Sequence, residues 1–230
     1  MSYSSNNLIA PHGGYRQLKS FQSAEIVFDL TVEFCNAFLA DHKTNKSYKS
    51  YRTYDQMVQA ARSGSRNIAE GSQTSGTSKQ SEIRLLDVAR ASLEELLADY
   101  IAFLRQNSLP LWRKDEPRAR EARALGYKTD RTHLTYMSYM IDAETAANCL
   151  ICLISQANYL LDQQIKSLGQ DFLRRGDFKD RYRSAQREEI MNPIRPIGPM
   201  DPDYQKFLKE QGLRSLKNGQ VVSLDDPREE

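Results

Sequence analysis

The feature that most constrains the fold is a long apolar stripe with the period of an α-helix. Between residues 83 and 104, apolar side chains recur every three or four positions and would line one face of a helix for about six turns. They are Ile83, Leu86, Ala89, Leu93, Leu97, Tyr100 and Leu104. No alternating strand pattern occurs in the first 170 residues. The sequence therefore predicts an all-α fold in which this stripe packs against other helices.

Three further segments share the helical period. One covers residues 19–40, with apolar side chains at Val27, Leu30, Phe34 and Phe38. Another covers residues 53–71, and the last covers residues 135–168. In the last segment the side chains expected to face inward are Ile141, Ile151, Ile154, Leu161, Ile165 and Leu168. Four long amphipathic helices favour an up-down four-helix bundle, which we place at residues 15–169.

Local signals predict where these helices begin and end. The pairs Thr53 with Gln56, and Thr77 with Gln80, match the capping box at a helix start. Glycines that could adopt the left-handed C-terminal conformation follow two of the helices, Gly71 and Gly169. We therefore expect a loop at residues 72–76. A charge-dense connection covers residues 108–131, with a short helix at 118–124.

Residues 170–230 differ in composition and are predicted to form a C-terminal suffix. A basic segment at residues 177–191 predicts one more helix. Prolines at every third position of residues 193–202 favour an extended polyproline II strap. Asp201-Pro202 predicts the start of a short helix to residue 211, and Asn218-Gly219 is typical of a two-residue hairpin turn. We expect the suffix to dock on the bundle or on a neighbouring subunit, and residues 1–14 to be disordered.

Composition argues against several functional classes. No apolar run is long enough to span a membrane, and the N-terminus lacks a signal peptide, so we expect a cytoplasmic protein. The motifs of phosphate-binding loops, zinc proteases and serine hydrolases are absent, and no Glu-x-x-His pair is present. We predict a protein that is not an enzyme and has no cofactor or metal. Cys149 and Cys152 are interpreted as buried core residues.

Several segments resemble one bacterial family. They are Tyr15 to Ala24 with its Phe21-Gln22 pair, Gln56 to Gly71 ending in Asn67-Ile68-Ala69-Glu70-Gly71, and Ala91-Ser92-Leu93-Glu94-Glu95-Leu96. Together they look like the four-helix-bundle proteins that include the intervening-sequence proteins of ribosomal RNA genes. The accessory protein of diversity-generating retroelements belongs to the same family. With its suffix, this chain looks like the longer variant of that family.

The resemblance implies a ring-like homo-oligomer, typically a pentamer, with a basic surface. In the retroelement accessory protein this surface binds RNA and a reverse transcriptase. The resemblance implies no catalytic residues. Asn67, Ile68, Ala69, Glu70 and Gly71 are interpreted as a structural motif at a corner of the bundle.

Clustered cations suggest where nucleic acid, RNA or DNA, would bind. Arg62 and Arg66 lie one helical turn apart, and a tyrosine-bearing basic loop precedes them. The candidate contacts are Arg62, Arg66, Lys79, Arg84, Lys46, Lys49 and Arg52. The formal net charge is only +2, so these cations could equally form an ordinary solvated face. The alternative function is a structural or protein-interaction module whose suffix docks on a protein partner.

Overall fold

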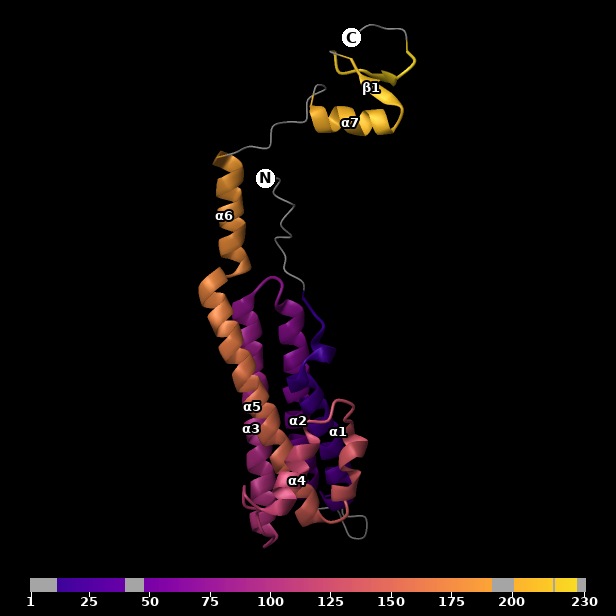
Figure 1. Ribbon diagram of the computed structural model, residues 1–230. Helices are drawn as coiled ribbons and strands as arrows, with labels where there is room; N and C mark the ends of the chain where they lie inside the picture. The colour runs from indigo at the N-terminus through magenta and orange to yellow at the C-terminus, as the bar shows by residue number, and fades with distance from the viewer. Residues whose placement is uncertain (1–11, 40–47, 192–200, 217, 227–230) are drawn as a thin grey trace. The chain divides into compact units, whose positions relative to one another are not determined.

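The computed structural model describes residues 12–39, 48–191, 201–216 and 218–226. Four long helices pack side by side in a bundle (Figure 1): α1 (Lys19–Phe34), α2 (Tyr48–Thr74), α3 (Lys79–Gln106) and α5 (Ala143–Arg175). Around the bundle they follow the order α1, α2, α3, α5, so each helix packs against two neighbours. The all-α fold and the bundle predicted from the sequence are confirmed.

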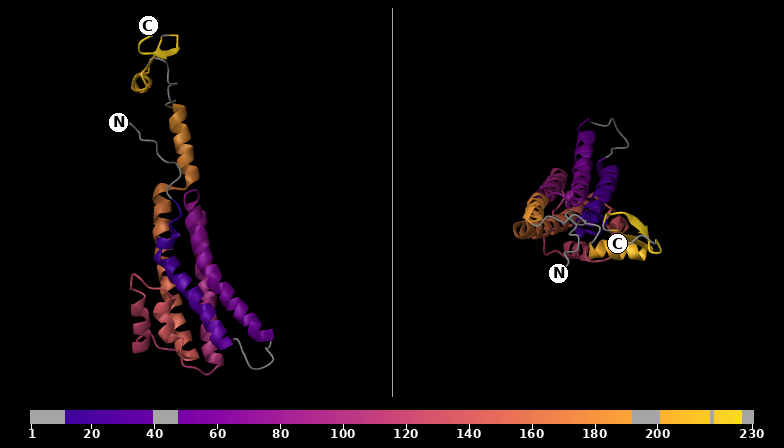
Figure 2. Two further views of the ribbon diagram at one scale, coloured as in Figure 1. Left: turned by 90° about the vertical axis from the view of Figure 1, so that its right-hand side faces the viewer. Right: turned by 90° about the horizontal axis from the view of Figure 1, so that it is seen from above.

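Shorter elements complete the chain (Figure 2). They are the 3₁₀-helices η1 (Tyr15–Gln17) and η3 (His133–Tyr139), the π-helix η2 (Cys35–Leu39), the helices α4 (Pro117–Leu125), α6 (Phe178–Met191) and α7 (Pro202–Glu210), and the strands β1 (Leu213–Ser215) and β2 (Val221–Ser223). The predicted helices at 118–124, 177–191 and 202–211 correspond to α4, α6 and α7. The chain divides into two compact units, Met1–Arg181 and Tyr182–Glu230.

The bundle core is a continuous apolar cluster contributed by all four long helices. Phe34 on α1 meets Tyr100 and Phe103 of α3 in edge-on ring contacts with centroids 5.0 Å apart. The fully buried Tyr100 hydroxyl donates a hydrogen bond to Thr31 Oγ1 at 3.1 Å, so its polar end is satisfied. Each fully buried leucine or phenylalanine here contributes roughly 1.5–3 kcal/mol.

Three predicted helix boundaries need correction, both ends of α2 and the start of α3. Helix α2 begins at Tyr48, so Thr53 lies inside it and the prediction that it starts the helix was wrong. It ends at Thr74, so Gly71 is an interior residue and the prediction that it ends the helix was wrong. Helix α3 is capped by Ser78, whose Oγ accepts from Ser81 N at 3.1 Å, so the predicted cap at Thr77 was wrong by one residue.

The reason Gly71 stays helical is its packing against α3. A Cβ at this position would lie 3.3 Å from the backbone oxygen of Glu82 and 3.4 Å from Leu85 Cβ. The glycine therefore allows the two helix backbones to approach closely. This role differs from the predicted one, in which Gly71 would end the helix in a left-handed conformation. At the same end of α2, Gly13 N donates to Ser72 O at 2.9 Å and Ser72 Oγ donates to Gly13 O. The disorder predicted for residues 1–14 concerns a segment of which the structure describes only residues 12–14, and it stays a prediction.

Both predicted ends of the last bundle helix were wrong. Residues 133–139 form the 3₁₀-helix η3, and α5 begins only after Asp142, which accepts from Thr145 N at 2.8 Å. Ile141 falls between the two helices and is 75% exposed, so it does not face the core. Gly169 lies within α5, and the helix ends before Gly176, whose positive φ of 65° is a backbone conformation that favours glycine.

The second compact unit contains α7 and the hairpin. Asp201 caps α7 by accepting from Asp203 N and Tyr204 N. The strands β1 and β2 pair antiparallel, with Arg214 opposite Val222, which confirms the predicted hairpin. The buried side chains of this unit include Leu208, Leu216 and Val222. The predicted proline strap lies largely at residues 192–200, outside the described residues.

Candidate functional site

The motif from residue 67 to residue 71 has a structural role in α2. Ile68 is fully buried and Ala69 is nearly so, whereas Asn67 is half-buried and Glu70 is exposed. Two turns before Gly71, Gly64 is also buried, and a Cβ there would lie 2.7 Å from Leu93 Cδ2 of α3. The two glycines therefore fit α2 against α3. The motif contributes packing, and it presents no cluster of reactive groups.

Arg62 and Arg66 are the best placed of the candidate nucleic-acid contacts. Both are exposed on α2, one turn apart. Among the described residues, Arg62 forms no ion pair, whereas Arg66 Nη1 lies 3.6 Å from Glu25 Oε1 on α1. That separation, at an exposed side chain, is a weak interaction. Both guanidinium groups therefore remain accessible to a ligand.

Acidic residues on α1 lie next to Arg66. Burial raises the pKa of Asp29, and the neighbouring charges of Glu25 and Glu33 raise it further, while His133 and Arg66 act in the opposite direction. His133 Nδ1 lies 3.5 Å from Asp29 Oδ2. The arginine pair therefore borders an acidic strip, which limits the basic surface to α2 itself.

Lys79 serves the end of the bundle and is a poor candidate contact. Its Nζ lies 3.0 Å from Glu82 Oε2, and its backbone nitrogen donates to Asp177 Oδ1 at 3.0 Å. Asp177 also accepts from the Ser78 hydroxyl at 3.3 Å. Burial raises the pKa of Glu82, and the hydrogen bond and charge of Lys79 oppose that rise. The lysine thus joins the start of α3 to the residues that follow α5.

The other predicted cations do not gather around Arg62. Arg84 is exposed on α3 and Arg52 is exposed near the start of α2, and neither forms an ion pair with the residues that the structure describes. Lys46 and the Lys49 side chain lie outside that description. The structure therefore brings Arg62 and Arg66 together and leaves the remaining candidates spread along two helices.

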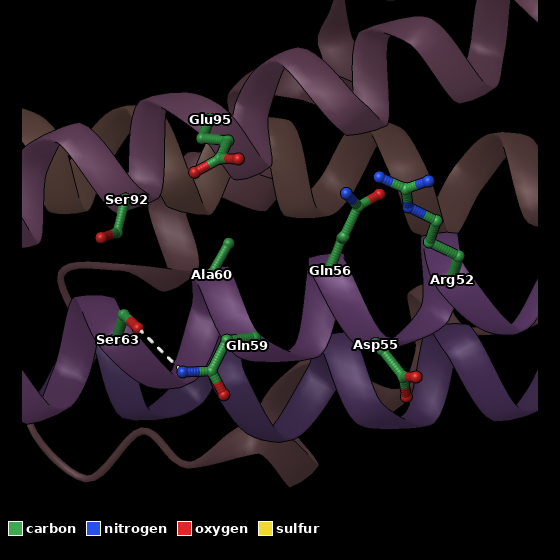
Figure 3. A pocket seen from close by; sticks show the side chains of 8 residues that line it. All are labelled: Arg52, Asp55, Gln56, Gln59, Ala60, Ser63, Ser92 and Glu95. Atoms are coloured by element: carbon green, nitrogen blue, oxygen red, sulfur yellow. Dashed lines mark hydrogen bonds between the residues drawn. The ribbon is translucent and has the colours of Figure 1, made fainter.

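A polar groove between α2 and α3 was missed by sequence reasoning. Its first part has a volume of about 520 Å³ (Figure 3), and its lining includes Arg52, Gln56, Gln59, Ser63, Ser92 and Glu95. A second hollow of about 420 Å³ shares Gln56 and reaches Asp99, Gln106 and Asn107 toward the end of α3. The signal in the sequence was small or polar side chains where two packed helices would face each other.

The cysteine thiols are buried in the core. All three cysteines are buried and free of disulfides, which confirms the interpretation of Cys149 and Cys152 as core residues. Burial raises the pKa of the Cys35 thiol to about 12 and that of Cys149 still higher, so neither forms a nucleophilic thiolate near neutral pH. Among the described residues, no three His, Cys, Asp or Glu side chains are grouped to hold a metal ion. Nor does any helix in the described ranges have the length and apolar character to cross a membrane.

No protein-family model, curated protein or solved structure matches this chain. The helical-bundle fold is the level at which the structure agrees with the resemblance seen in the sequence. Membership of the four-helix-bundle family stays a prediction.

Proposed function

We propose that the protein is a non-enzymatic, homo-oligomeric scaffold of the four-helix-bundle family that associates with RNA in the cytoplasm. The observation that carries the proposal is the exposed pair Arg62 and Arg66 on α2. Two guanidinium groups one turn apart can neutralise neighbouring phosphates and release their counterions. By the family resemblance the oligomer is a pentamer, and repetition around a ring would multiply a small basic patch into a stronger local field.

RNA retention measured against salt concentration tests this function. If both arginines contact phosphates of single-stranded RNA, the double variant Arg62→Ala/Arg66→Ala lowers the slope of log K against log salt by about 1.4. The matched control is Arg105→Ala/Arg120→Ala, which removes two other exposed cations. Equal losses in the two double variants would mean that only total charge matters. If the protein binds no RNA at low salt, the proposed function is refuted. The same measurement with DNA shows whether the protein prefers one of the two nucleic acids.

A second candidate function is a protein-interaction module without nucleic-acid binding. The groove between α2 and α3 favours it, because it is a hollow open to a partner and carries polar side chains from both helices. In this alternative the suffix docks on a partner or a neighbouring subunit. Light scattering at micromolar concentration tests the oligomer that both candidates share, and a clean monomer would refute it.

A further inference from the structure

The groove between α2 and α3 is long enough to hold a short peptide. Its two hollows adjoin at Gln56, and Phe38 and Leu39 of η2 also line the second one; together we call them the channel. On α3 the channel runs from Ser92 to Gln106, which at 1.5 Å per residue is about 21 Å. Ala60, Ser63 and Ser92 contribute only short side chains to one end of it. A partner backbone can therefore approach α2 and α3 closely.

The charges lining the channel select a cationic occupant. The described lining carries three carboxylates, Asp55, Glu95 and Asp99, and one guanidinium, Arg52, so its net charge is −2. None of these carboxylates forms an ion pair with another described residue. Glu95 and Asp99 also lie one turn apart on α3, where like charges repel. A cation placed between them would relieve that repulsion.

The electrostatic state of Asp99 agrees with this assignment. Burial raises the pKa of Asp99, and the charge of Glu95 raises it further. Asp99 therefore lacks the stabilisation that a bound cation would supply. The amide groups of Gln56, Gln106 and Asn107 line the same channel and can accept or donate hydrogen bonds to a peptide.

We propose that this channel binds a lysine- or arginine-rich helical segment of a partner protein. A helix of about four turns matches the channel length, and its long cationic side chains reach Glu95 and Asp99. Phosphates would be repelled by the same carboxylates, so the channel is a different site from the arginine pair proposed for RNA. The inference is independent of RNA binding and gives the second candidate function a specific partner chemistry.

The test is fluorescence anisotropy of a labelled lysine–alanine peptide of about fourteen residues, the number that spans the channel as a helix. The matched peptide carries glutamine at every lysine. The double variant Glu95→Gln/Asp99→Asn removes two channel charges and is expected to weaken binding roughly tenfold, as loss of two partly exposed ion pairs would. The control Asp87→Asn/Glu121→Gln makes the same charge change at exposed sites outside the channel and leaves binding unchanged. Equal weakening by both double variants would overturn the proposal, as would binding of the glutamine peptide.

A steric variant tests the site without altering charge. Ser92→Trp places a bulky ring in the first hollow, and it weakens peptide binding strongly if the peptide lies there. Circular dichroism checks that the bundle stays helical. Undiminished binding by a folded Ser92→Trp protein would refute the assignment. Loss of RNA binding in this variant, or displacement of the peptide by RNA, would instead make the channel a nucleic-acid site. If RNA binding is lost in Arg62→Ala/Arg66→Ala but kept in Ser92→Trp, the RNA result supports the proposed function and leaves the peptide site to be decided by peptide binding.

Discussion

Replacing Gly64 by alanine tests how closely α2 and α3 approach each other. The new Cβ would lie 2.7 Å from Leu93 Cδ2 and 2.9 Å from Leu93 Cγ. Leu93 is fully buried, so its side chain cannot swing into solvent to relieve the overlap. Forcing an extra methyl group into a packed core costs about 1–3 kcal/mol. Alanine also gains about 1 kcal/mol over glycine in helix propensity, so the net expectation is a loss of roughly 1 kcal/mol.

Gly169 provides a matched control on another helix. It lies within α5, and nothing comes within 4 Å of a Cβ built there. Gly169→Ala should therefore raise the free energy of unfolding by up to about 1 kcal/mol through propensity alone. The difference between the two variants is then about 2 kcal/mol, which urea unfolding followed by circular dichroism resolves. Equal stabilisation by both substitutions would refute the close approach of α2 to α3.

Three further outcomes follow from the same contacts. The raised pKa of Glu82 means that its stabilising contribution is complete below its usual value of 4.5 and is lost as pH rises through the folded-state pKa. Glu82→Gln should reduce this loss of stability with rising pH. The measurement is the urea midpoint between pH 4 and 8, a range that includes the ordinary Glu pKa. If the midpoints of the variant and the original protein depend on pH equally, the reasoning fails. Asp142→Ala removes the cap of α5 and should cost about 1 kcal/mol. Urea unfolding measures this loss, and the neighbouring exposed Ile141→Ala, which removes no cap, should be nearly neutral and serves as the control. The buried cysteines should react with a thiol reagent only after unfolding; prompt reaction of the native protein would contradict their burial.

Helix existence was predictable because it depends on a long repeated pattern. The stripe from Ile83 to Leu104 extends over most of α3, so its helical period remains recognisable even if one residue departs from the pattern. Helix ends depend on one or two residues, and tertiary packing can override them. Gly71 and Gly169 both resemble helix stops in the sequence, yet one fits α2 against α3 and the other lies in open space within α5.

The candidate sites were likewise predictable from the sequence only in part. The exposure of Arg62 and Arg66 follows from their place opposite the apolar face of α2, which the sequence reveals. The engagement of Lys79 could not be predicted, because it depends on Asp177, 98 residues away. The groove depends on how α2 and α3 are rotated about their axes, since this decides whether Ser63 and Ser92 face each other or face the core. Periodicity identifies a helix face but does not specify which residue of a neighbouring helix meets it.

Sedimentation velocity with labelled single-stranded RNA tests the proposed function most directly. The proposal predicts that RNA sediments with a species containing several copies of the chain, and that Arg62→Ala/Arg66→Ala releases the RNA while leaving the protein assembly intact. Protein sedimenting as a single chain, with the RNA remaining unbound at low salt, would contradict it.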